Sequence, residues 1–237
     1  MNQKHNSVAV LGATGYIGAR LVPKLLESGL KVRAIGRNPN KLKGRIWSNS
    51  AGVETVFGDV FDVDSLEQAV SGCEVVYYLV HSMNPNVGDF AEADRIAAKN
   101  MVEVADRTGV RRIIFLAGLG EENVDLSHHL KSRREVEQVL RSGNVPVTTL
   151  RAAMIIGSGS ASFEILRYLV ERLPVMVTPK WIFTECQPIA VRNVLHYLVA
   201  CLDCPETVGE TYDIGTEEIV TYCDLMRIYA EEAGLTK

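Results

Sequence analysis

The sequence predicts an α/β protein built on a doubly wound parallel sheet, with a small lobe towards its C-terminal end. Apolar runs typical of strands alternate with amphipathic patterns typical of helices over most of the chain. One of these runs, Val75–Val80, is apolar throughout, as expected of a strand that is covered on both faces. A glycine-rich turn, Gly12–Gly18, follows the first strand and opens the first helix. A turn in this position is typical of doubly wound sheets.

The strands and helices of the core are expected in alternation. The expected strands are Val8–Leu11, Lys31–Ile35, Val53–Phe57, Val75–Val80, Arg112–Leu116 and Val147–Leu150. The expected helices are Tyr16–Ser28, Asp64–Val70, Ala91–Thr108 and Leu130–Arg141. Strand–helix–strand units are right-handed crossovers, so the strands that they join run parallel.

The pattern changes after Gly157. A loop of small residues, Ser158–Ser162, leads into a region with prolines at 174, 179 and 188. Its expected elements are the helices Phe163–Arg172, Val191–Leu202 and Asp224–Ala233 and the strand Thr211–Ile214. We therefore predict a core over residues 1–157 and a small substrate lobe over residues 158–237, packed on the same domain.

The composition excludes several classes of function. The 237 residues include 25 Lys and Arg and 29 Asp and Glu, so the chain lacks the basic field that nucleic-acid binding needs. No apolar run is long enough to span a membrane, and the first six residues carry no signal-peptide pattern. Five scattered cysteines suit the reducing cytoplasm, where we expect the protein. We interpret Cys201–Cys204 as a helix end and expect no metal and no disulfide.

The glycine-rich turn predicts a dinucleotide site. Its glycines follow the spacing G-x-x-G-x-x-G, a variant of the dinucleotide-binding motif. Glycine permits a tight turn and lets backbone N–H groups approach a pyrophosphate, towards which the next helix points its positive end. The residues expected to contact the cofactor here are Gly12, Thr14, Gly15, Tyr16, Ile17 and Gly18.

The end of the second strand favours NADP(H) over NAD(H). Sites for NAD usually place an acidic residue about 20 residues after the glycine turn, where it binds the ribose 2′-hydroxyl. Residues 34–38 contain no acid here, and Arg37 lies at that position. A guanidinium can bind a 2′-phosphate through two hydrogen bonds. The alternative interpretation of Arg37 is a solvated loop residue.

Four motifs in order resemble the short-chain dehydrogenase/reductase superfamily, in its atypical NmrA-like and epimerase/dehydratase-like branches. They are the glycine turn, Gly58–Val60, Leu150–Arg151 followed by Gly157, and Gln187–Val194. The resemblance implies an NAD(P)-binding Rossmann fold. It also implies that the cofactor contacts Asp59, Val60, Leu79, Val80, His81, Ala117, Arg133 and Met154.

The catalytic positions depart from this family's pattern. Relatives carry a serine after the fifth strand and a Tyr-x-x-x-Lys motif on the next helix. Here Ala117 follows the fifth strand, and no tyrosine is present on the helix. One alignment, anchored on Glu137, places His129 and Arg133 at the Tyr and Lys positions, and we take these as the catalytic candidates. A second alignment places Ser127 and Lys131 there.

Three functions compete on this evidence. The first is an NADPH-dependent oxidoreductase or epimerase with a nonstandard acid and an unidentified small-molecule substrate. The second is a regulator that senses NADP, and the third is an assembly or scaffold protein that retains the cofactor. The aromatic second region favours the first, and the missing tyrosine favours the others. Only three residues follow Gly234, so we also expect the chain to be part of a longer protein with a further C-terminal domain. Its absence would leave an exposed apolar patch near Trp181 and Phe183 that drives self-association into a homo-oligomer. The alternative is a naturally compact protein with a small lobe.

Overall fold

The structure is a computed structural model that describes residues 7–81, 90–119, 128–172 and 180–235. The side chains of residues 128–130 and 180 lie outside this description. The chain forms two compact units. The first combines Met1–Arg151 with Leu195–Tyr212, and the second combines Ala152–Val194 with Asp213–Lys237.

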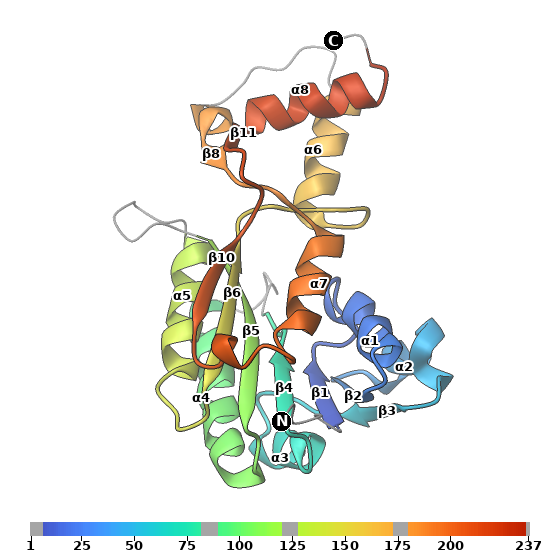
Figure 1. The fold of residues 1–237 in the computed structure, drawn as a ribbon, viewed down its shortest axis with the longest axis vertical. Coiled ribbons are helices and arrows are strands. Elements are labelled where there is room, and N and C mark those ends of the chain that lie inside the picture. The colour runs from blue at the N-terminus through green and yellow to red at the C-terminus, as the bar shows by residue number, and fades with distance from the viewer. Residues whose placement is uncertain (1–6, 82–89, 120–127, 173–179, 236–237) are drawn as a thin grey trace. The chain divides into compact units, whose positions relative to one another are not determined.

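The first unit contains a seven-stranded sheet in the order β10-β6-β5-β4-β1-β2-β3 (Figure 1). The strands are β1 (Ser7–Leu11), β2 (Lys31–Gly36), β3 (Val53–Phe57), β4 (Val75–Tyr78), β5 (Arg112–Gly118), β6 (Val147–Ala152) and β10 (Thr211–Ile214). The pairs β1–β2, β1–β4, β2–β3 and β4–β5 are parallel. The predicted doubly wound α/β fold is confirmed.

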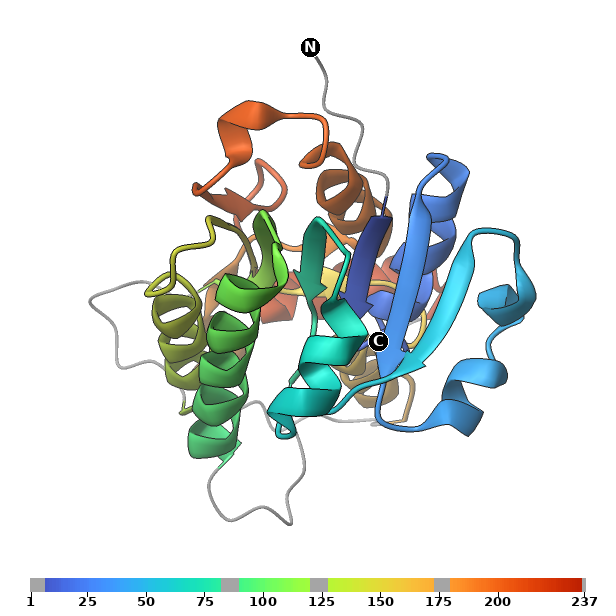
Figure 2. The same ribbon diagram turned by 90° about the horizontal axis from the view of Figure 1, so that it is seen from below.

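Helices cover both faces of this sheet (Figure 2). They are α1 (Gly18–Glu27), α2 (Pro39–Lys43), α3 (Val63–Val70), α4 (Phe90–Thr108), α5 (His128–Leu140) and α7 (Val191–Ala200), with short 3-10 turns η1 (Ile46–Asn49) and η3 (Pro205–Thr207). Buried residues of α3, α4 and α5 pack against Tyr78 and Phe115 in one large core. Neighbouring residues of a strand face opposite ways. Tyr77 accordingly donates a hydrogen bond of 2.9 Å to the Leu198 carbonyl of α7, on the other face.

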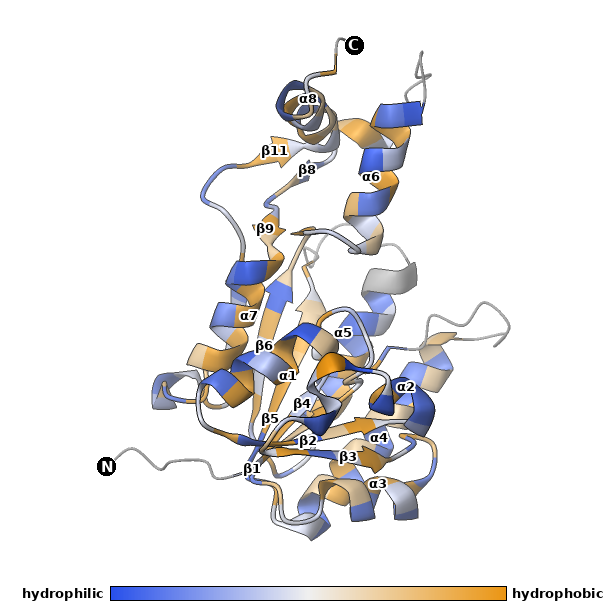
Figure 3. Cartoon of the chain, turned by 90° about the vertical axis from the view of Figure 1, so that its right-hand side faces the viewer, coloured by the Kyte–Doolittle hydropathy of each residue, from blue (hydrophilic) through white to orange (hydrophobic). Residues whose placement is uncertain are grey.

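The second unit is small and has its own core. Its elements are β7 (Ile155–Ile156), α6 (Ala161–Arg172), η2 (Lys180–Phe183), β8 (Glu185–Cys186), β9 (Ile189–Ala190), β11 (Val220–Thr221) and α8 (Tyr222–Glu232). β7 pairs with β9 in parallel, and β8 pairs with β11 antiparallel. Hydrophobic and hydrophilic residues alternate along α6 and α8 (Figure 3). The buried core residues are Met154, Leu166, Val170, Leu225, Met226 and Ala230.

The strand Thr211–Ile214 lies in a different place from the one predicted. We expected it in the C-terminal lobe, but β10 is the edge strand of the main sheet, next to β6. The compact units therefore also differ from a division at residue 157, because the chain returns to the first unit over Leu195–Tyr212. The hydrogen bond from Thr149 N to Glu210 O, 2.9 Å long, ties this returning segment to the sheet.

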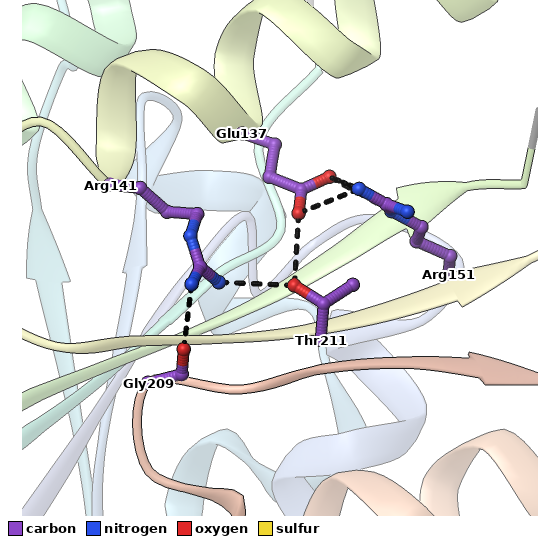
Figure 4. Close-up of polar contacts among 5 residues, drawn as sticks. All are labelled: Glu137, Arg141, Arg151, Gly209 and Thr211. Atoms are coloured by element: carbon purple, nitrogen blue, oxygen red, sulfur yellow. Dashed lines mark hydrogen bonds and ion pairs between the residues drawn. The ribbon is translucent and has the colours of Figure 1, made fainter. Parts of the chain in front are cut away.

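A polar network around the buried carboxylate of Glu137 holds β10 in this position (Figure 4). Glu137 of α5 accepts hydrogen bonds of 3.0 and 3.1 Å from Arg151 and one of 3.1 Å from the Thr211 hydroxyl. Arg141 donates to the Thr211 hydroxyl at 3.0 Å and to the Gly209 carbonyl at 2.8 Å. The edge strand β10, 74 residues after Glu137, thus meets α5 and β6 at one carboxylate. The periodicity of the sequence does not predict these contacts of Glu137 with Arg151 and Thr211.

No helix in the described part of the chain is long and apolar enough to cross a membrane.

Candidate dinucleotide-binding site

The glycine turn lies at the topological switch point of the sheet. Leu11, the last residue of β1, is in register with Ile35 of β2 on one side and with Tyr78 of β4 on the other. The chain leaves β1 towards β2, whereas β4 follows later in the sequence. Doubly wound sheets bind their ligands at this crevice, outside the carboxyl ends of the strands.

Two glycines of the turn are required by close backbone contact. Gly12 has a φ of +83°, and a Cβ atom there would lie 2.7 Å from the Leu79 carbonyl oxygen. A Cβ atom at Gly18 would overlap the Gly12 carbonyl and lie 2.9 Å from the Ala13 Cα. Neither position has room for a side chain. These glycines bring the start of α1 close against the end of β1.

Gly15 is different because the space above it is open. A Cβ atom there would meet only the Gly12 carbonyl oxygen, at 3.2 Å, and the residue is exposed. The Gly15 N–H donates to Gly12 O at 2.9 Å, which closes the turn. The N-cap of α1, Ile17, makes no side-chain cap, so no side chain competes for the N–H groups of the first turn. A tight, uncapped turn with an open face fits a pyrophosphate.

Arg37 directly follows β2 at the same edge of the sheet. Its side chain is exposed, and among the described residues it makes no hydrogen bond or ion pair. Asn38 then caps α2 by accepting from the Lys41 N–H at 3.1 Å. The guanidinium therefore stands at the carboxyl end of β2 without a carboxylate beside it.

The segment after α2 returns to the glycine turn. Arg45 donates a short hydrogen bond to the Thr14 carbonyl, and Trp47 donates one of 2.9 Å to the Ala19 carbonyl. Within the turn, the Arg20 guanidinium lies 4.1 Å from the centre of the Tyr16 ring. These contacts fix the outer wall of the turn. Sequence analysis did not identify Arg45, although it is the fourth cation in the run from Arg37.

Asp59 and Val60, two of the predicted cofactor contacts, lie just past the end of β3. The Asp59 carboxylate accepts from the Phe61 N–H at 3.1 Å, so it shapes its own turn. The Val60 side chain is buried, and its carbonyl accepts from Asn100 at 2.8 Å. Leu79 and Val80, by contrast, follow β4 directly beside Gly12, as the Leu79 N–H bond of 3.1 Å to Leu11 O shows.

Arg133 is buried behind the ends of β4 and β5. Its guanidinium donates to the Val80 carbonyl at 3.3 Å and to the Leu116 carbonyl at 2.6 Å, and it lies 4.8 Å from the centre of the Phe115 ring. Burial lowers the pKa of Arg133, and the negative charge of Asp94 opposes that shift. Arg133 thus holds two strand ends together. Ala117, at the position where the sequence analysis expects serine in relatives, directly follows Leu116 and is buried.

A second polar cluster occupies the same edge of the sheet. His81 Nδ1 lies 3.1 Å from Asp94 Oδ2, and the Ser132 hydroxyl donates to the same oxygen at 3.2 Å. His81 follows β4, Asp94 lies on α4 and Ser132 lies on α5. The side chains of His81 and Asp94 are 21% and 4% exposed. This arrangement can fix one tautomer of an imidazole at the switch point.

The sequence analysis missed Asp94 and Ser132. One signal for Asp94 was available, because this acid interrupts the small apolar stripe of α4 that Ala93, Ala97 and Ala98 form. An acid on the buried face of a helix needs a partner. The residues that contact Asp94 are His81 and Ser132, which come from other segments of the chain. The spacing of residues along the sequence does not identify them.

His129 is the second residue of α5, but its side chain is outside the described residues, as is Ser127 altogether. Met154 is 2% exposed and belongs to the core of the second unit. Cys201–Cys204 forms the turn after α7, as expected, and among the described residues no group of three His, Cys, Asp or Glu side chains could hold a metal.

Comparison with known proteins identifies the family. A family model described as NAD(P)H-binding matches residues 12–168. Cinnamoyl-CoA reductase 1 of Petunia hybrida is 32% identical over 122 residues, 50% of this chain and 37% of that protein. The photosystem II assembly factor Ycf39 of Trieres chinensis is 22% identical over 224 residues, 92% of this chain and 68% of that protein. The solved UDP-glucose 4-epimerase of Thermotoga maritima matches with a TM-score of 0.77 at 19% identity, covering 98% of this chain and 84% of that one.

The matched model covers more than half of the chain, so the chain belongs to the family of NAD(P)H-binding proteins. The predicted resemblance to the extended and atypical short-chain dehydrogenase/reductases is confirmed. The chain spans about a third of the petunia reductase that it matches.

Proposed function

We propose that this protein binds NADP(H) in preference to NAD(H) and uses it in an oxidoreductase or epimerase-like reaction on a small molecule. The observation that supports this proposal is the exposed guanidinium of Arg37 at the end of β2, where NAD-binding proteins of this fold usually carry an acid. The adenosine ribose of a cofactor bound on the glycine turn lies beside the end of this strand.

The charge around Arg37 supports the proposal. Residues 37–45 contain four cations and no acid. A 2′-phosphate carries negative charge, so its binding gains from each nearby cation and would be opposed by a carboxylate. NADH lacks this phosphate and gains nothing from Arg37. The ratio of the NADPH affinity to the NADH affinity therefore measures the contribution of the Arg37 side chain to binding.

Titration calorimetry with NADPH and NADH tests the proposal. In the Arg37→Ala variant, NADPH affinity falls at least about tenfold and NADH affinity stays within about twofold, since one charge-assisted contact is worth about 1.4 kcal/mol or more. Arg111→Ala is the matched control, because Arg111 is also exposed but precedes β5, at the amino ends of the parallel strands. An unchanged NADPH/NADH ratio in Arg37→Ala overturns the assignment.

A second function rests on a specific observation. The similarity to an assembly factor covers 92% of this chain, and the helix α5 carries no tyrosine at the positions where relatives place their acid. A cofactor-retaining regulator or assembly protein would bind NADPH and turn nothing over. Incubation with NADPH and a panel of quinones, aldehydes and ketones separates the two functions. Turnover of any member supports the enzyme. His129 and Arg133 remain the candidates that sequence alignment provides.

A further inference from the structure

We propose that the groove between α1 and η1 binds small organic acids, in which a carboxylate is joined to an apolar body. Pro23, Leu26 and Glu27 line this groove from α1, and Arg45, Ile46 and Trp47 line it from η1 and its N-cap. Residues 12–18 of the glycine turn, which the structure describes, do not line it. The proposal therefore goes beyond the cofactor site and names a second binding site in the first unit.

The first observation is the size of the groove and the fixing of its walls. Its volume is about 830 Å³, and small-molecule sites in proteins usually measure roughly 300–1,000 Å³. Trp47 is 6% exposed, and its indole N–H donates a hydrogen bond of 2.9 Å to the Ala19 carbonyl of α1. Arg45 donates to the Thr14 carbonyl, just before α1. These two bonds hold η1 against the start of α1, so the groove is formed before a ligand binds.

The second observation is that the groove has apolar sides. Ile46 is fully exposed, although its neighbours Arg45 and Trp47 are both anchored by hydrogen bonds. Its backbone is therefore held in place while its side chain stands in water. Pro23 and Leu26 present further apolar surface from α1, and both are only half-buried. A ligand with an apolar body gains free energy by removing this surface from water.

The third observation is the charge of the groove. Among the described residues, Arg45 is the one cation that lines it. Its hydrogen-bond partner is the Thr14 carbonyl, which is uncharged and uses one of the five guanidinium N–H donors. Glu27 is the acid at the groove, and its Oε2 lies 2.6 Å from Lys24 Nζ in an exposed ion pair. A planar guanidinium matches a carboxylate through two parallel hydrogen bonds, so we expect the head of the ligand to be a carboxylate.

The apolar sides and the cation together select the class of ligand. An inorganic anion would pair with Arg45 and leave the apolar sides of the groove in water. A neutral apolar molecule would cover those sides and leave the guanidinium without a negative partner. An organic acid satisfies both, because its carboxylate pairs with Arg45 while its body covers Ile46, Pro23 and Leu26. The volume of the groove leaves room for a body of several carbon atoms.

The fluorescence emission of Trp47 tests occupancy of the groove directly. The chain contains two tryptophans, so the Trp181→Phe variant leaves Trp47 as the only one. At constant ionic strength, we expect sodium hexanoate to change this emission until it saturates. Hexan-1-ol, which has the same apolar body without the charge, should bind about tenfold more weakly, and acetate, which lacks the body, should not saturate. The absence of a saturable change with hexanoate, or equal affinity for hexan-1-ol, overturns the proposal.

Charge variants at Ile46 test the site without disturbing the fold, because this side chain is fully exposed. In the Trp181→Phe background, Ile46→Glu should lower hexanoate affinity about fivefold, since it adds a like charge, whereas Ile46→Lys should not lower it. Ile165→Glu on α6, another exposed isoleucine, is the control and leaves the affinity unchanged. Arg45→Gln should bring the affinities for hexanoate and hexan-1-ol to within about twofold of each other. Equal hexanoate affinities in the two Ile46 variants, both shown to be folded by thermal unfolding, overturn the proposal.

A glycine variant separates this groove from the cofactor site. Gly15→Val places a side chain on the open face of the glycine turn, which is not part of the groove. Its hexanoate affinity should therefore stay at the wild-type value. Loss of hexanoate binding in a folded Gly15→Val overturns the inference, because the acid would then lie on the glycine turn. A wild type that binds hexanoate but no NADPH overturns the proposed function and leaves this inference standing.

Discussion

The two compact units differ in how far their cores can be predicted from the amino-acid sequence. In the first, strands repeat with regular spacing, and one continuous core contains side chains from β1, β4, β5 and three helices. In the second, six buried residues come from two stretches that are more than 50 residues apart in sequence. It also leaves Trp181 and Phe183 50% and 64% exposed. A regular repeat is visible in a sequence, whereas a core assembled from distant stretches is not.

The largest expected effect of a substitution is at the glycine turn of the first unit. Two variants there separate the packing role of one glycine from the cofactor-binding role of another. Gly18→Val forces a side chain into the Gly12 carbonyl and the Ala13 Cα, so it lowers the free energy of unfolding of the first unit by about 3 kcal/mol or more. Gly15→Val meets only one atom, at 3.2 Å, and points into the open face. It leaves the fold largely intact and abolishes cofactor binding.

Urea unfolding followed by circular dichroism, together with NADPH calorimetry, measures both effects. The two glycines are three residues apart in one turn, so each variant is the control for the other. Equal stability of the two variants would contradict the packing argument. Undiminished NADPH affinity in Gly15→Val would contradict the phosphate site.

The next largest effect concerns Glu137, which ties β10 and β6 to α5. Glu137→Ala leaves Arg151 without its carboxylate and Thr211 without an acceptor, so unfolding becomes easier by about 3 kcal/mol. Arg141→Ala removes only an exposed part of the same network and costs less than about 1 kcal/mol. Denaturant midpoints compare the two. A Glu137→Ala variant as stable as wild type would show that packing alone holds β10 in the sheet.

The sequence predicted the parts of the first unit that depend on neighbouring residues. The six core strands, the glycine turn and the alternation of elements follow from local periodicity and from the backbone demands of Gly12 and Gly18. The predicted strand Thr211–Ile214 has the observed bounds, yet its place beside β6 was missed because it depends on contacts across the fold. The His81–Asp94–Ser132 cluster was missed for the same reason. Its members come from the segment after β4, from α4 and from α5, and their contacts depend on how these segments pack together.

In the second unit, a core substitution is expected to act locally. Leu166→Ala removes a side chain that is 4% exposed and packs in the six-residue core, so it destabilises this unit by about 2–3 kcal/mol. NADPH affinity of the glycine turn stays unchanged, because Leu166 belongs to the other unit. Hydrogen exchange, read by mass spectrometry, should show faster exchange in α6 and α8 alone. Ile165→Ala, whose side chain is 60% exposed on the same helix, is the control and changes little. Faster exchange throughout the sheet would show that the units unfold together.

The smallest effect concerns pH and the start of α8. Asp224 accepts hydrogen bonds from the Thr221 hydroxyl at 2.6 Å and from the Thr221 N–H at 3.0 Å, and Arg227 lies nearby. These contacts lower the pKa of Asp224, chiefly through the Thr221 hydroxyl. A carboxyl group with a lowered pKa in the folded state stabilises that state above its unfolded pKa, and the contribution is lost as the pH falls through the folded value. The protection of the α8 amides, taken as the ratio of the intrinsic to the observed hydrogen-exchange rate, should therefore fall in acid, and it should fall less in Asp224→Asn, which has no charge to lose. Thr221→Val, which removes the main cause of the shift, should raise the carboxyl pKa that NMR titration measures. An unchanged titration in Thr221→Val would show that the capping box does not set the charge of this helix start.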